Sequence, residues 1–382
     1  MNANILNNSS LRPALFWSKS KKGWKRIIAS NPIDILEGDK TLPVEIIQQY
    51  FKKYTGKLIL GFISYEYGVA QHDVITSNPS LFNIPDVYFA AYDKYEEIDK
   101  IPLSNDLVDP RLAFQSTTSK QQYLDAIGNI INHIRQGNIY QANFTHFLKS
   151  EYEGESYQLF KQMIRQNPVE FSSFLHTPDF TIHSLSPERF ATIRGNSIFT
   201  EPIKGTRPRG ENQAADNQNR EALLSSEKEK AELNMITDLL RNDLGKISEI
   251  GSVNVTKNRE VMPLEAVWHT HSIIEGHLKE NVSPIEAILS MIPGGSITGC
   301  PKKRAVEIID DLETYKRGLY TGTIGIQYPN GDSDWSIAIR TLIEQNNNLY
   351  LGIGGGITLD SIPEDEYAES LAKAKSFMEI RT

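Results

Sequence analysis

The strand-like and helix-like segments of this 382-residue chain do not alternate regularly, and this order is what most constrains its fold. Runs rich in β-branched and aromatic residues predict strands at 57–65 (KLILGFISY) and 87–92. Further strands are predicted in close succession at 172–175, 181–184, 191–194 and 197–200. A doubly wound parallel sheet needs a crossover helix between neighbouring strands. We therefore predict an α+β fold with antiparallel sheets that are flanked by helices.

The predicted helices lie between groups of strands. Isoleucines recur at three- and four-residue spacing from Ser119 to about residue 134, and further helices are predicted over 156–166, 226–240 and 363–380. Residues 207–220 are polar and predict a surface loop, whereas 139–148, 320–327, 335–344 and 349–353 predict strands. Charge and proline replace apolar residues over 96–110, which places a soft boundary there. We expect a β-rich segment at 1–112 that completes the sheets of a catalytic domain at 113–382, in one integrated fold.

Composition excludes several classes of protein. Cys300 is the single cysteine, so a disulfide framework and a cysteine-based zinc site are both excluded. The formal net charge is −8, which argues against general nucleic-acid binding. There is no run of about 20 apolar residues and no evident signal peptide. We expect a soluble cytoplasmic protein that binds neither nucleic acid nor membranes.

Two glycine-rich segments fail the nucleotide-binding templates. In GGSITGCPK, Cys300 stands where a phosphate loop requires lysine. In GIGGG, Ile357 occupies the last glycine position of a dinucleotide fingerprint. Both segments are either ordinary turns or places where the backbone approaches an anion that is not a nucleotide.

Two pairs of glutamates are spaced three residues apart on predicted helices, Glu229 with Glu232 and Glu366 with Glu369. Residues at this spacing share one helix face. Four carboxylates on two helices could converge on a hard cation such as Mg²⁺. Each pair by itself is equally consistent with a solvated surface beside a helix cap.

Single residues remain ambiguous at this level. Lys204 is either a surface turn lysine or, in a buried site, a nucleophile. Glu188 is either a partner of Arg189 or a general acid–base, and His269 is typical of a hydrogen-bonded core histidine. Arg340 lies among apolar residues, where an arginine usually needs an anionic partner.

Taken together, the motifs resemble those of the chorismate-utilising enzymes. They are SPERF (186–190), PIKGT (202–206), EKEKAELNMITDLLRNDLGKI (227–247), VWHTHS (267–272), PGGSITGCPKKRAVEIIDDLE (293–313), RGLYTGTIGI (317–326), AIRT (338–341) and GIGGGITLDSIPEDEYAESLAKAKS (352–376). They cover about residues 119–382 in order, and GFISYEYG at 61–68 matches more loosely. The resemblance implies a fold of large antiparallel sheets packed face to face.

The resemblance also implies roles for individual residues. It makes Glu229, Glu232, Glu366 and Glu369 ligands of Mg²⁺, direct or through water, and Lys204, Glu188 and His269 catalytic residues. The positions that it assigns to substrate binding are Arg340, Tyr320, Thr298, Gly354, Gly355, Lys302, Gln141 and Thr206.

Two positions separate the branches of the family. Water-adding relatives place a lysine base where this chain has Gln141, which disfavours that branch. Among the amine-adding relatives, PIAGT is typical of anthranilate synthases and PIKGT of aminodeoxychorismate synthases, and this chain has Lys204. The resemblance therefore implies that chorismate and ammonia give 4-amino-4-deoxychorismate through a covalent bond to Lys204.

The ammonia is expected from a separate glutamine amidotransferase subunit, because this chain has no cysteine in a glutamine-hydrolase nucleophile elbow. Two alternatives stay open. One is an anthranilate synthase component I or a 2-amino-2-deoxyisochorismate synthase. The other, from another class, is a non-catalytic chorismate-binding regulatory subunit.

Overall fold

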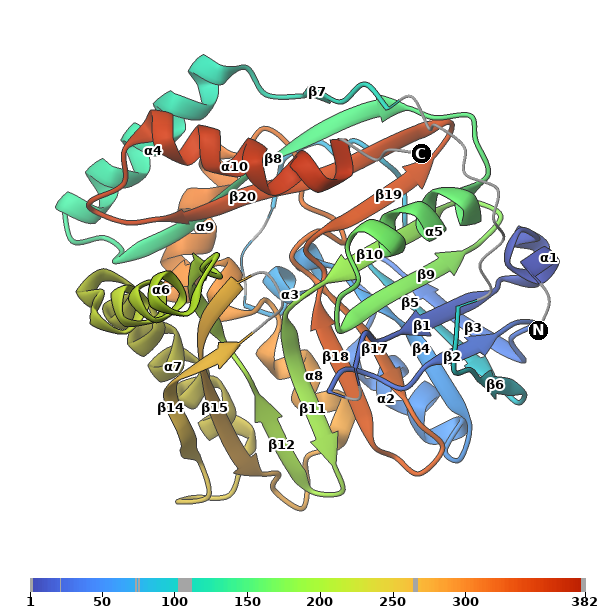
Figure 1. Ribbon diagram of the computed structural model, residues 1–382. Coiled ribbons are helices and arrows are strands. Elements are labelled where there is room, and N and C mark those ends of the chain that lie inside the picture. The colour runs from blue at the N-terminus through green and yellow to red at the C-terminus, as the bar shows by residue number, and fades with distance from the viewer. Residues whose placement is uncertain are drawn as a thin grey trace.

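The computed structural model describes residues 3–20, 22–72, 74, 76–101, 112–263 and 267–378. In these ranges the chain forms two antiparallel sheets of ten strands each, named sheet A and sheet B here. The sheets pack face to face and helices cover their outer surfaces (Figure 1). This arrangement confirms the predicted α+β class with large antiparallel sheets. Among the described residues, no helix is both long and apolar enough to cross a membrane.

Sheet A contains the long strands that follow and precede the glycine-rich motifs. In spatial order its strands are β16 (Gly299–Cys300), β8 (Gln141–Glu151), β20 (Asn348–Ile357), β19 (Thr341–Gln345), β10 (Thr181–Ser186), β9 (Phe171–His176), β1 (Ala14–Trp17), β2 (Ile27–Ala29) and β6 (Tyr95–Glu97), with β7 (Gln115–Ser116) paired to β8.

Sheet B contains the strand that carries Lys204. In spatial order its strands are β13 (Ile203–Pro208), β15 (Val267–His277), β12 (Ser197–Thr200), β11 (Arg189–Arg194), β18 (Ser333–Ile337), β17 (Thr323–Gln327), β4 (Leu58–Ile63), β5 (Val87–Tyr92) and β3 (Asp34–Gly38), with β14 (Asn254–Pro263) paired to β15.

The strands of the first hundred residues extend both sheets. β1, β2 and β6 form one end of sheet A, and β4, β5 and β3 form one end of sheet B. Aromatic and aliphatic side chains from both parts of the chain, such as Phe62, Phe147 and Ile324, share the apolar layer between the sheets. The predicted boundary at residue 112 follows residues 102–111, which lie outside the described part of the chain.

The helices bury one face each against a sheet. α2, α7 and α8 pack on sheet B, α5 and α10 pack on sheet A, and α4 and α9 cover β8. The helices are α1 (Ala3–Leu6), α2 (Val44–Lys53), α3 (Tyr65–Ala70), α4 (Lys120–Arg135), α5 (Ser156–Gln166), α6 (Gln213–Ser225), α7 (Glu227–Ile247), α8 (Pro284–Met291), α9 (Lys302–Leu312) and α10 (Pro363–Met378), with 3₁₀ turns η1 (Ser9–Leu11) and η2 (Gly295–Ile297).

The predicted helices at 119–134, 156–166, 226–240 and 363–380 are present as α4, α5, α7 and α10. Ser119 caps α4 in a reciprocal capping box with Gln122. α7 runs seven residues beyond its predicted end at Leu240, because Leu244 and Ile247 continue its buried face. Residues 379 and 380 of the last predicted helix lie outside the described residues.

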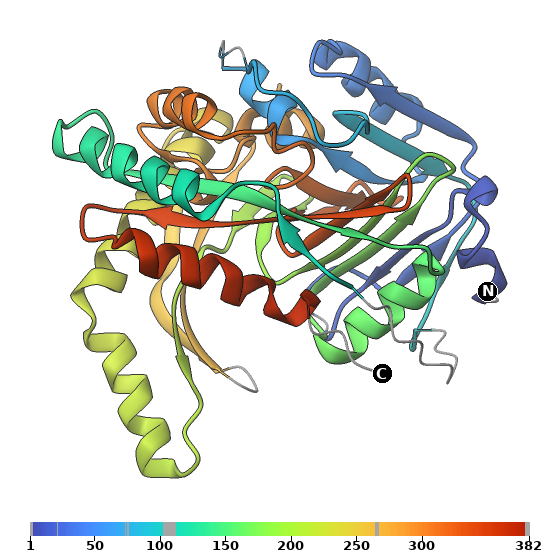
Figure 2. The ribbon, with the colours of Figure 1, turned by 90° about the horizontal axis from the view of Figure 1, so that it is seen from above.

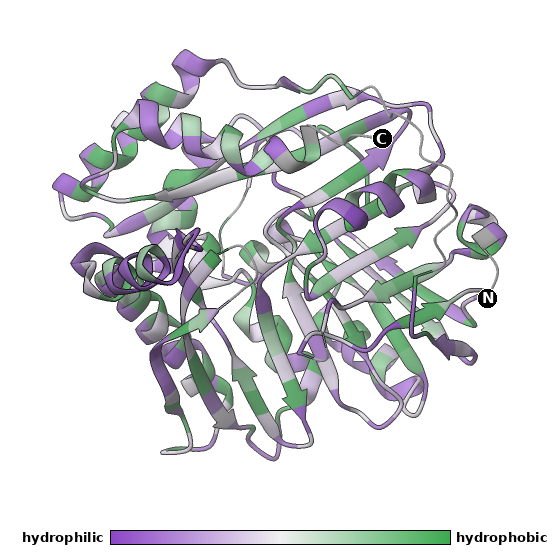
Figure 3. Ribbon diagram, in the orientation of Figure 1, coloured by the Kyte–Doolittle hydropathy of each residue, from purple (hydrophilic) through white to green (hydrophobic). Residues whose placement is uncertain are grey.

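The prediction of a surface loop at 207–220 is wrong. β13 continues to Pro208, and α6 then begins at Gln213. Asn212 caps α6, and Asp216 accepts hydrogen bonds from Arg209 (2.7 and 2.8 Å) and from the Trp268 indole (2.9 Å). These polar contacts hold α6 in place although it has little apolar surface. The helix projects from the body at the lower left of Figure 2 and is largely hydrophilic in Figure 3.

The single strand predicted over 335–344 is also wrong. The structure divides it into β18, in sheet B, and β19, in sheet A. Between them Arg340 has a φ of +52°, in the left-handed region that interrupts a strand. The chain therefore crosses from one sheet to the other at residues 338–340.

Candidate active site

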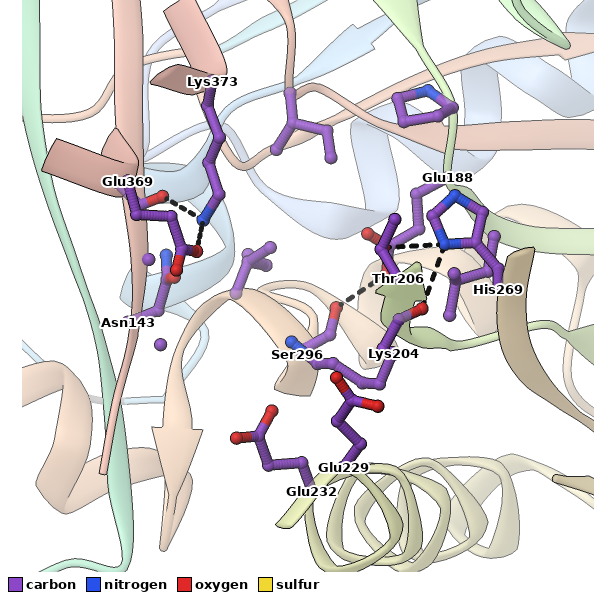
Figure 4. A pocket seen from close by; sticks show the side chains of 18 of the residues that line it. Asn143, Glu188, Lys204, Thr206, Glu229, Glu232, His269, Ser296, Glu369 and Lys373 are labelled. Atoms are coloured by element: carbon purple, nitrogen blue, oxygen red, sulfur yellow. Dashed lines mark hydrogen bonds and ion pairs between the residues drawn. The ribbon is translucent and has the colours of Figure 1, made fainter. Parts of the chain in front are cut away.

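A cleft of about 750 Å³ opens between the two sheets, and most of the chemically notable residues line it. One wall comes from β8 and β20 of sheet A, and the other from β13 and β15 of sheet B. α7 and α10 contribute side chains, as do η2 and the two connections between the sheets (Figure 4).

Two strand pairs bring Glu188 and Arg340 to the cleft. β10 and β19 pair in sheet A, and their continuations β11 and β18 pair in sheet B. Glu188 lies in the β10–β11 connection and Arg340 in the β18–β19 connection. Backbone hydrogen bonds hold both connections. The Ile337 amide donates to the Glu188 carbonyl oxygen (3.1 Å), and the Leu185 amide donates to the Arg340 carbonyl oxygen (2.9 Å). Both side chains thus reach the cleft where the paired strands leave one sheet for the other.

The carboxyl group of Glu188 has the environment of a general acid. Burial raises its pKa, and the charge of Lys204 and a 3.2 Å hydrogen bond from the Ser296 hydroxyl only partly oppose this effect. A carboxyl group with a raised pKa keeps its proton more readily near neutral pH. Glu188 can therefore donate a proton to a group bound beside it.

Lys204 lies on β13 beside a bulge. Gly205 has a φ of +74°, and the register between β13 and β15 shifts between residues 204 and 206. The Thr270 hydroxyl holds the Lys204 carbonyl, while the Lys204 side chain lines the cleft with that of Glu188 (Figure 4). Within the described residues, no hydrogen bond or ion pair occupies its amine, so the amine is available to a substrate.

His269 supports this strand from β15. Its Nδ1 lies 2.9 Å from the Thr206 hydroxyl and 3.1 Å from the Gly205 carbonyl oxygen (Figure 4). Burial lowers the pKa of His269, which favours the neutral imidazole. The contacts connect His269 and Thr206 to the bulge next to Lys204.

The two glutamate pairs face the cleft from different helices. Glu229 and Glu232 extend from α7 at the bottom of Figure 4, and Glu369 extends from α10 at its left. Glu229 Oε1 accepts a 2.7 Å hydrogen bond from Arg207, but its buried Oε2 has no hydrogen-bond partner among the described residues. Among the described residues, no three carboxylate, imidazole or thiol groups gather closely enough to hold a metal ion.

The pKa values of the two α10 glutamates are shifted in opposite directions. Burial raises the pKa of Glu366, although the Ser361 hydroxyl donates to its Oε1 at 2.6 Å. Burial acts in the same sense on Glu369, but the hydrogen bond from Lys373 and the charges of Lys373, Lys228 and Lys204 together lower that pKa. Lys373 Nζ lies 2.8 Å from Glu369 and donates to the Gly354 carbonyl oxygen at 3.0 Å.

Several expected substrate contacts line the same cleft. Arg340, Tyr320, Gln141, Gly354 and Gly355 all border it. Burial lowers the pKa of Arg340, and the side-chain oxygen of Gln141 is buried without a hydrogen-bond partner in the described part of the chain. These groups can meet the carboxylates and hydroxyl of a small anionic ring.

The glycines of β20 make room for two of these side chains. A Cβ at Gly352 would lie 2.2 Å from the Tyr320 ring, and one at Gly356 would lie 2.4 Å from the Gln141 amide nitrogen. Contacts this short do not occur between real atoms. The glycine-rich segment therefore shapes the cleft by the absence of side chains.

Thr298 and Lys302, which were expected to contact the substrate, are not among the residues that line the cleft. The Thr298 hydroxyl is fully buried and donates to the Gly294 carbonyl oxygen at 2.9 Å. Lys302 forms a 2.8 Å ion pair with Asp243 that joins α9 to α7. Both side chains stabilise the walls around the cleft.

Other residues lining the cleft were not among the expected site residues. Ser296 contacts Glu188, Arg207 contacts Glu229, and Lys373 contacts Glu369. Lys373 was the easiest to find from the sequence, because it follows Glu369 by four residues on one helix face. Ser296 and Arg207 reach their partners only through the tertiary fold.

Comparison with known proteins finds a matching family and similar sequences. The family described as chorismate binding enzyme matches residues 12–379. An anthranilate synthase component 1 of Haloarcula marismortui is 40% identical over 265 residues, which are 69% of this chain and 53% of the relative. An aminodeoxychorismate synthase component 1 of Salmonella typhimurium is 40% identical over 266 residues, 70% of this chain and 59% of the relative. The matched region therefore spans little more than half the length of these relatives.

The fold also matches a solved structure. The crystal structure of anthranilate synthase component I from Streptococcus pneumoniae superposes with a TM-score of 0.85 at 27% sequence identity. The match covers 94% of this chain and 93% of that chain. The two relatives and this structure include two kinds of amine-adding synthase, so their names leave the product open.

Proposed function

The chain belongs to the chorismate-binding enzyme family, and we propose that it is an aminodeoxychorismate synthase component I that converts chorismate and ammonia to 4-amino-4-deoxychorismate. At the coarser level, it is a chorismate-utilising enzyme of the aminodeoxychorismate and anthranilate synthase type. The observation that carries the proposal is the Lys204 amine, which forms no hydrogen bond or ion pair with the described residues and lies in the same cleft as the buried carboxyl group of Glu188.

The two groups divide the chemistry between them. The Lys204 amine attacks ring carbon 2 of chorismate while the double bond shifts and the hydroxyl group on carbon 4 departs. Glu188 protonates that hydroxyl, for which its raised pKa suits it. Ammonia then attacks carbon 4 and releases the lysine, so the enolpyruvyl group is retained. Covalent catalysis of this kind replaces one difficult step by two easier ones.

The substrate is oriented by the other residues of the cleft. Arg340 and Tyr320 bind a carboxylate of chorismate, and the backbone at Gly354 and Gly355 approaches the same anion because no side chain intervenes. Gln141 lies where a water-adding enzyme needs a base, and an amide cannot accept that proton. His269 and Thr206 keep the Lys204 strand in position.

The donor set of the cleft fits Mg²⁺ in kind. Glu229, Glu232, Glu366 and Glu369 are the oxygen ligands that this ion prefers, and the unpartnered Oε2 of Glu229 is a position for it. We propose that these four residues hold the ion, directly or through water. When bound, Mg²⁺ supplies positive charge to the substrate carboxylate.

The amine donor and the chain organisation complete the proposal. The component 1 names of the relatives support a separate glutamine amidotransferase partner that supplies ammonia. We also propose that residues 1–112 and 113–382 act as one integrated unit, which the shared apolar layer between the sheets supports.

Anthranilate synthase component I is the second candidate, and the Haloarcula relative favours it. In that reaction ammonia attacks carbon 2 directly and pyruvate is lost, so Lys204 would have no covalent role. A non-catalytic chorismate-binding subunit is the third candidate, and the unobstructed Lys204 amine argues against it.

Product analysis tests these candidates. The protein is incubated with chorismate, Mg²⁺ and ammonium, and the products are resolved by mass. We expect 4-amino-4-deoxychorismate from the unaltered protein and loss of most of that product from Lys204→Ala. Anthranilate as the single product, or unchanged turnover of Lys204→Ala, would contradict the proposal. Chorismate binding without turnover would favour the regulatory subunit.

A further inference from the structure

We propose that Arg317, which lies behind the cleft, is a positioning residue for the proposed reaction: its guanidinium group fixes the two backbone segments that present Ser296 and Asn143. The inference rests on the proposed function for the identity of the reaction. The contacts of Arg317 that support it do not depend on that function. Arg317 follows α9 and is not among the residues that line the cleft.

Every N–H group of the Arg317 guanidinium has an acceptor. Nε and Nη2 both donate to the Glu313 carboxylate. Nη2 also donates to the Asn143 carbonyl oxygen. Nη1 donates to the Ile297 carbonyl oxygen at 2.8 Å and to the Thr321 hydroxyl at 3.3 Å. Because the side chain is only 1% exposed, water cannot replace a lost partner. A guanidinium has five donors in a fixed plane, and all five are used.

The surroundings of Arg317 make the ion pair a rigid junction. Glu313 Oε1 also accepts hydrogen bonds from the Thr145 amide (2.9 Å) and hydroxyl (2.8 Å), so the pair is joined to β8 at two points. The Glu66 carboxylate accepts a 2.8 Å hydrogen bond from the Arg317 backbone amide, and the centre of the Tyr65 ring lies 4.5 Å from the guanidinium carbon. The Glu313 carboxylate and the carbonyl oxygens of Asn143 and Ile297 therefore meet at the Arg317 side chain.

The junction leads directly to the catalytic groups. Ile297, whose carbonyl oxygen Arg317 holds, follows Ser296, and the Ser296 hydroxyl donates to Glu188. Asn143 itself borders the cleft. Loss of the guanidinium would remove the link that it makes between the Ile297 and Asn143 carbonyl oxygens, while the Asn143 amide would still donate to the Thr298 carbonyl oxygen at 2.6 Å. We expect this loss to weaken the contact between Ser296 and Glu188. The charged group that acts on Glu188 is Lys204 on β13, and Lys204 is not among the hydrogen-bond partners of Arg317.

A positioning role has a signature that a merely structural role lacks. The Ser296 hydrogen bond lowers the pKa of Glu188, so losing it raises that pKa further. Arg317→Lys, which keeps the charge beside Glu313, should raise the pKa of Glu188 in the same direction as Ser296→Ala. In the Ser296→Ala background it should cause no additional shift, because the contact that it acts through is already absent.

The experiment measures the titration of Glu188 in the full chain. Glutamate carboxyl carbons are labelled for NMR, Glu188 is assigned with Glu188→Gln, and its pKa is compared in the wild type, Ser296→Ala, Arg317→Lys and the double variant. Chorismate consumption is followed in parallel, whichever amine product forms. We expect Arg317→Lys to lower kcat by roughly tenfold to a hundredfold, as for misplaced catalytic groups.

Two further variants keep the test decisive. Arg194→Lys is a control for the pattern of contacts, because Arg194 also binds a carboxylate through two hydrogen bonds and two backbone carbonyl oxygens, but its side chain is 43% exposed and lies away from this cleft. Thr321→Val removes one acceptor of Arg317 and serves if Arg317→Lys does not fold. An unchanged Glu188 pKa in Arg317→Lys and Thr321→Val, or independent shifts in the double variant, would overturn the inference. Absence of chorismate turnover in the wild type would instead contradict the proposed function and leave the NMR result interpretable.

Discussion

Gly205→Ala tests whether the bulge beside Lys204 also shapes the proposed metal site. Gly205 has a φ of +74°, which costs a residue with a Cβ about 1–2 kcal/mol. Gly137, at the end of α4, has the same φ of +74°, and a Cβ there would meet nothing within 4 Å. Gly137→Ala is therefore the matched control. We expect both variants to lose about 1–2 kcal/mol of unfolding free energy in urea titrations.

The two positions differ in what the added methyl group touches. A Cβ at residue 205 would lie 2.9 Å from Glu229 Oε2 and 2.9 Å from Leu223 Cδ1, whereas ordinary contacts begin at 3.4 Å. The Glu229 carboxylate would have to move by 3.4 − 2.9 = 0.5 Å to reach an ordinary contact distance. Its other oxygen is held by Arg207, so the carboxylate cannot turn freely.

The displaced oxygen is the one that we propose as a position for Mg²⁺. Altering the support of a metal ligand typically weakens metal binding about 10- to 100-fold. We expect Gly205→Ala to weaken Mg²⁺ binding by about tenfold in calorimetric titrations. Gly137→Ala should bind Mg²⁺ as the wild type does. Equal Mg²⁺ affinity in both variants, with the same loss of stability, would refute the link between the bulge and Glu229.

Three further results are expected. Ser296→Ala should raise the apparent pKa of Glu188 in the pH dependence of kcat/KM, because the lost hydrogen bond favours the carboxylate; a lower pKa would contradict this. Mg²⁺ binding should weaken as the pH falls through the raised pKa of Glu366, and this part of the pH dependence should disappear in Glu366→Gln when binding is measured by calorimetry. Arg209 holds the pKa of Asp216 well below its usual value near 3.8, so the contribution of this pair to stability is complete above that value and is lost as the pH falls through the folded-state pKa. Asp216→Asn should accordingly make α6 more accessible to limited proteolysis at neutral pH, and an unchanged cleavage rate would show that other contacts hold the helix.

Local patterns predicted the elements with a clear apolar pattern, whereas α2, α3, α8, α9, β14 and β15 were not predicted. The isoleucine spacing after Ser119 predicted α4, and runs rich in β-branched and aromatic residues predicted β4 and β5 nearly to the residue. Two errors, at 207–220 and 335–344, share a cause. α6 is held by Arg209 and Trp268 rather than by an apolar face, and β18 ends because the chain changes sheets. Neither event leaves a periodic pattern in the sequence.

The candidate site divides in the same way. Sequence motifs selected Lys204, Glu188 and Arg340, and the structure places all three in one cleft. The motifs also selected Thr298 and Lys302, whose side chains turn to Gly294 and Asp243 instead. A motif indicates that a segment lies near the site. It does not distinguish the residues that line the cleft from those that stabilise its walls.

The sequence by itself determined the class of fold, the family and the types of residue available for catalysis, because these depend on local periodicity and on ordered motifs. Only the tertiary structure decided which of them meet. Glu188 and Arg340 are 152 positions apart, yet they enter one cleft because two paired strands cross together from sheet A to sheet B. The Ser296 contact with Glu188 and the Arg317 junction behind it likewise join segments that are distant in sequence. Contacts of this kind depend on the packing of the two sheets, which no local pattern encodes.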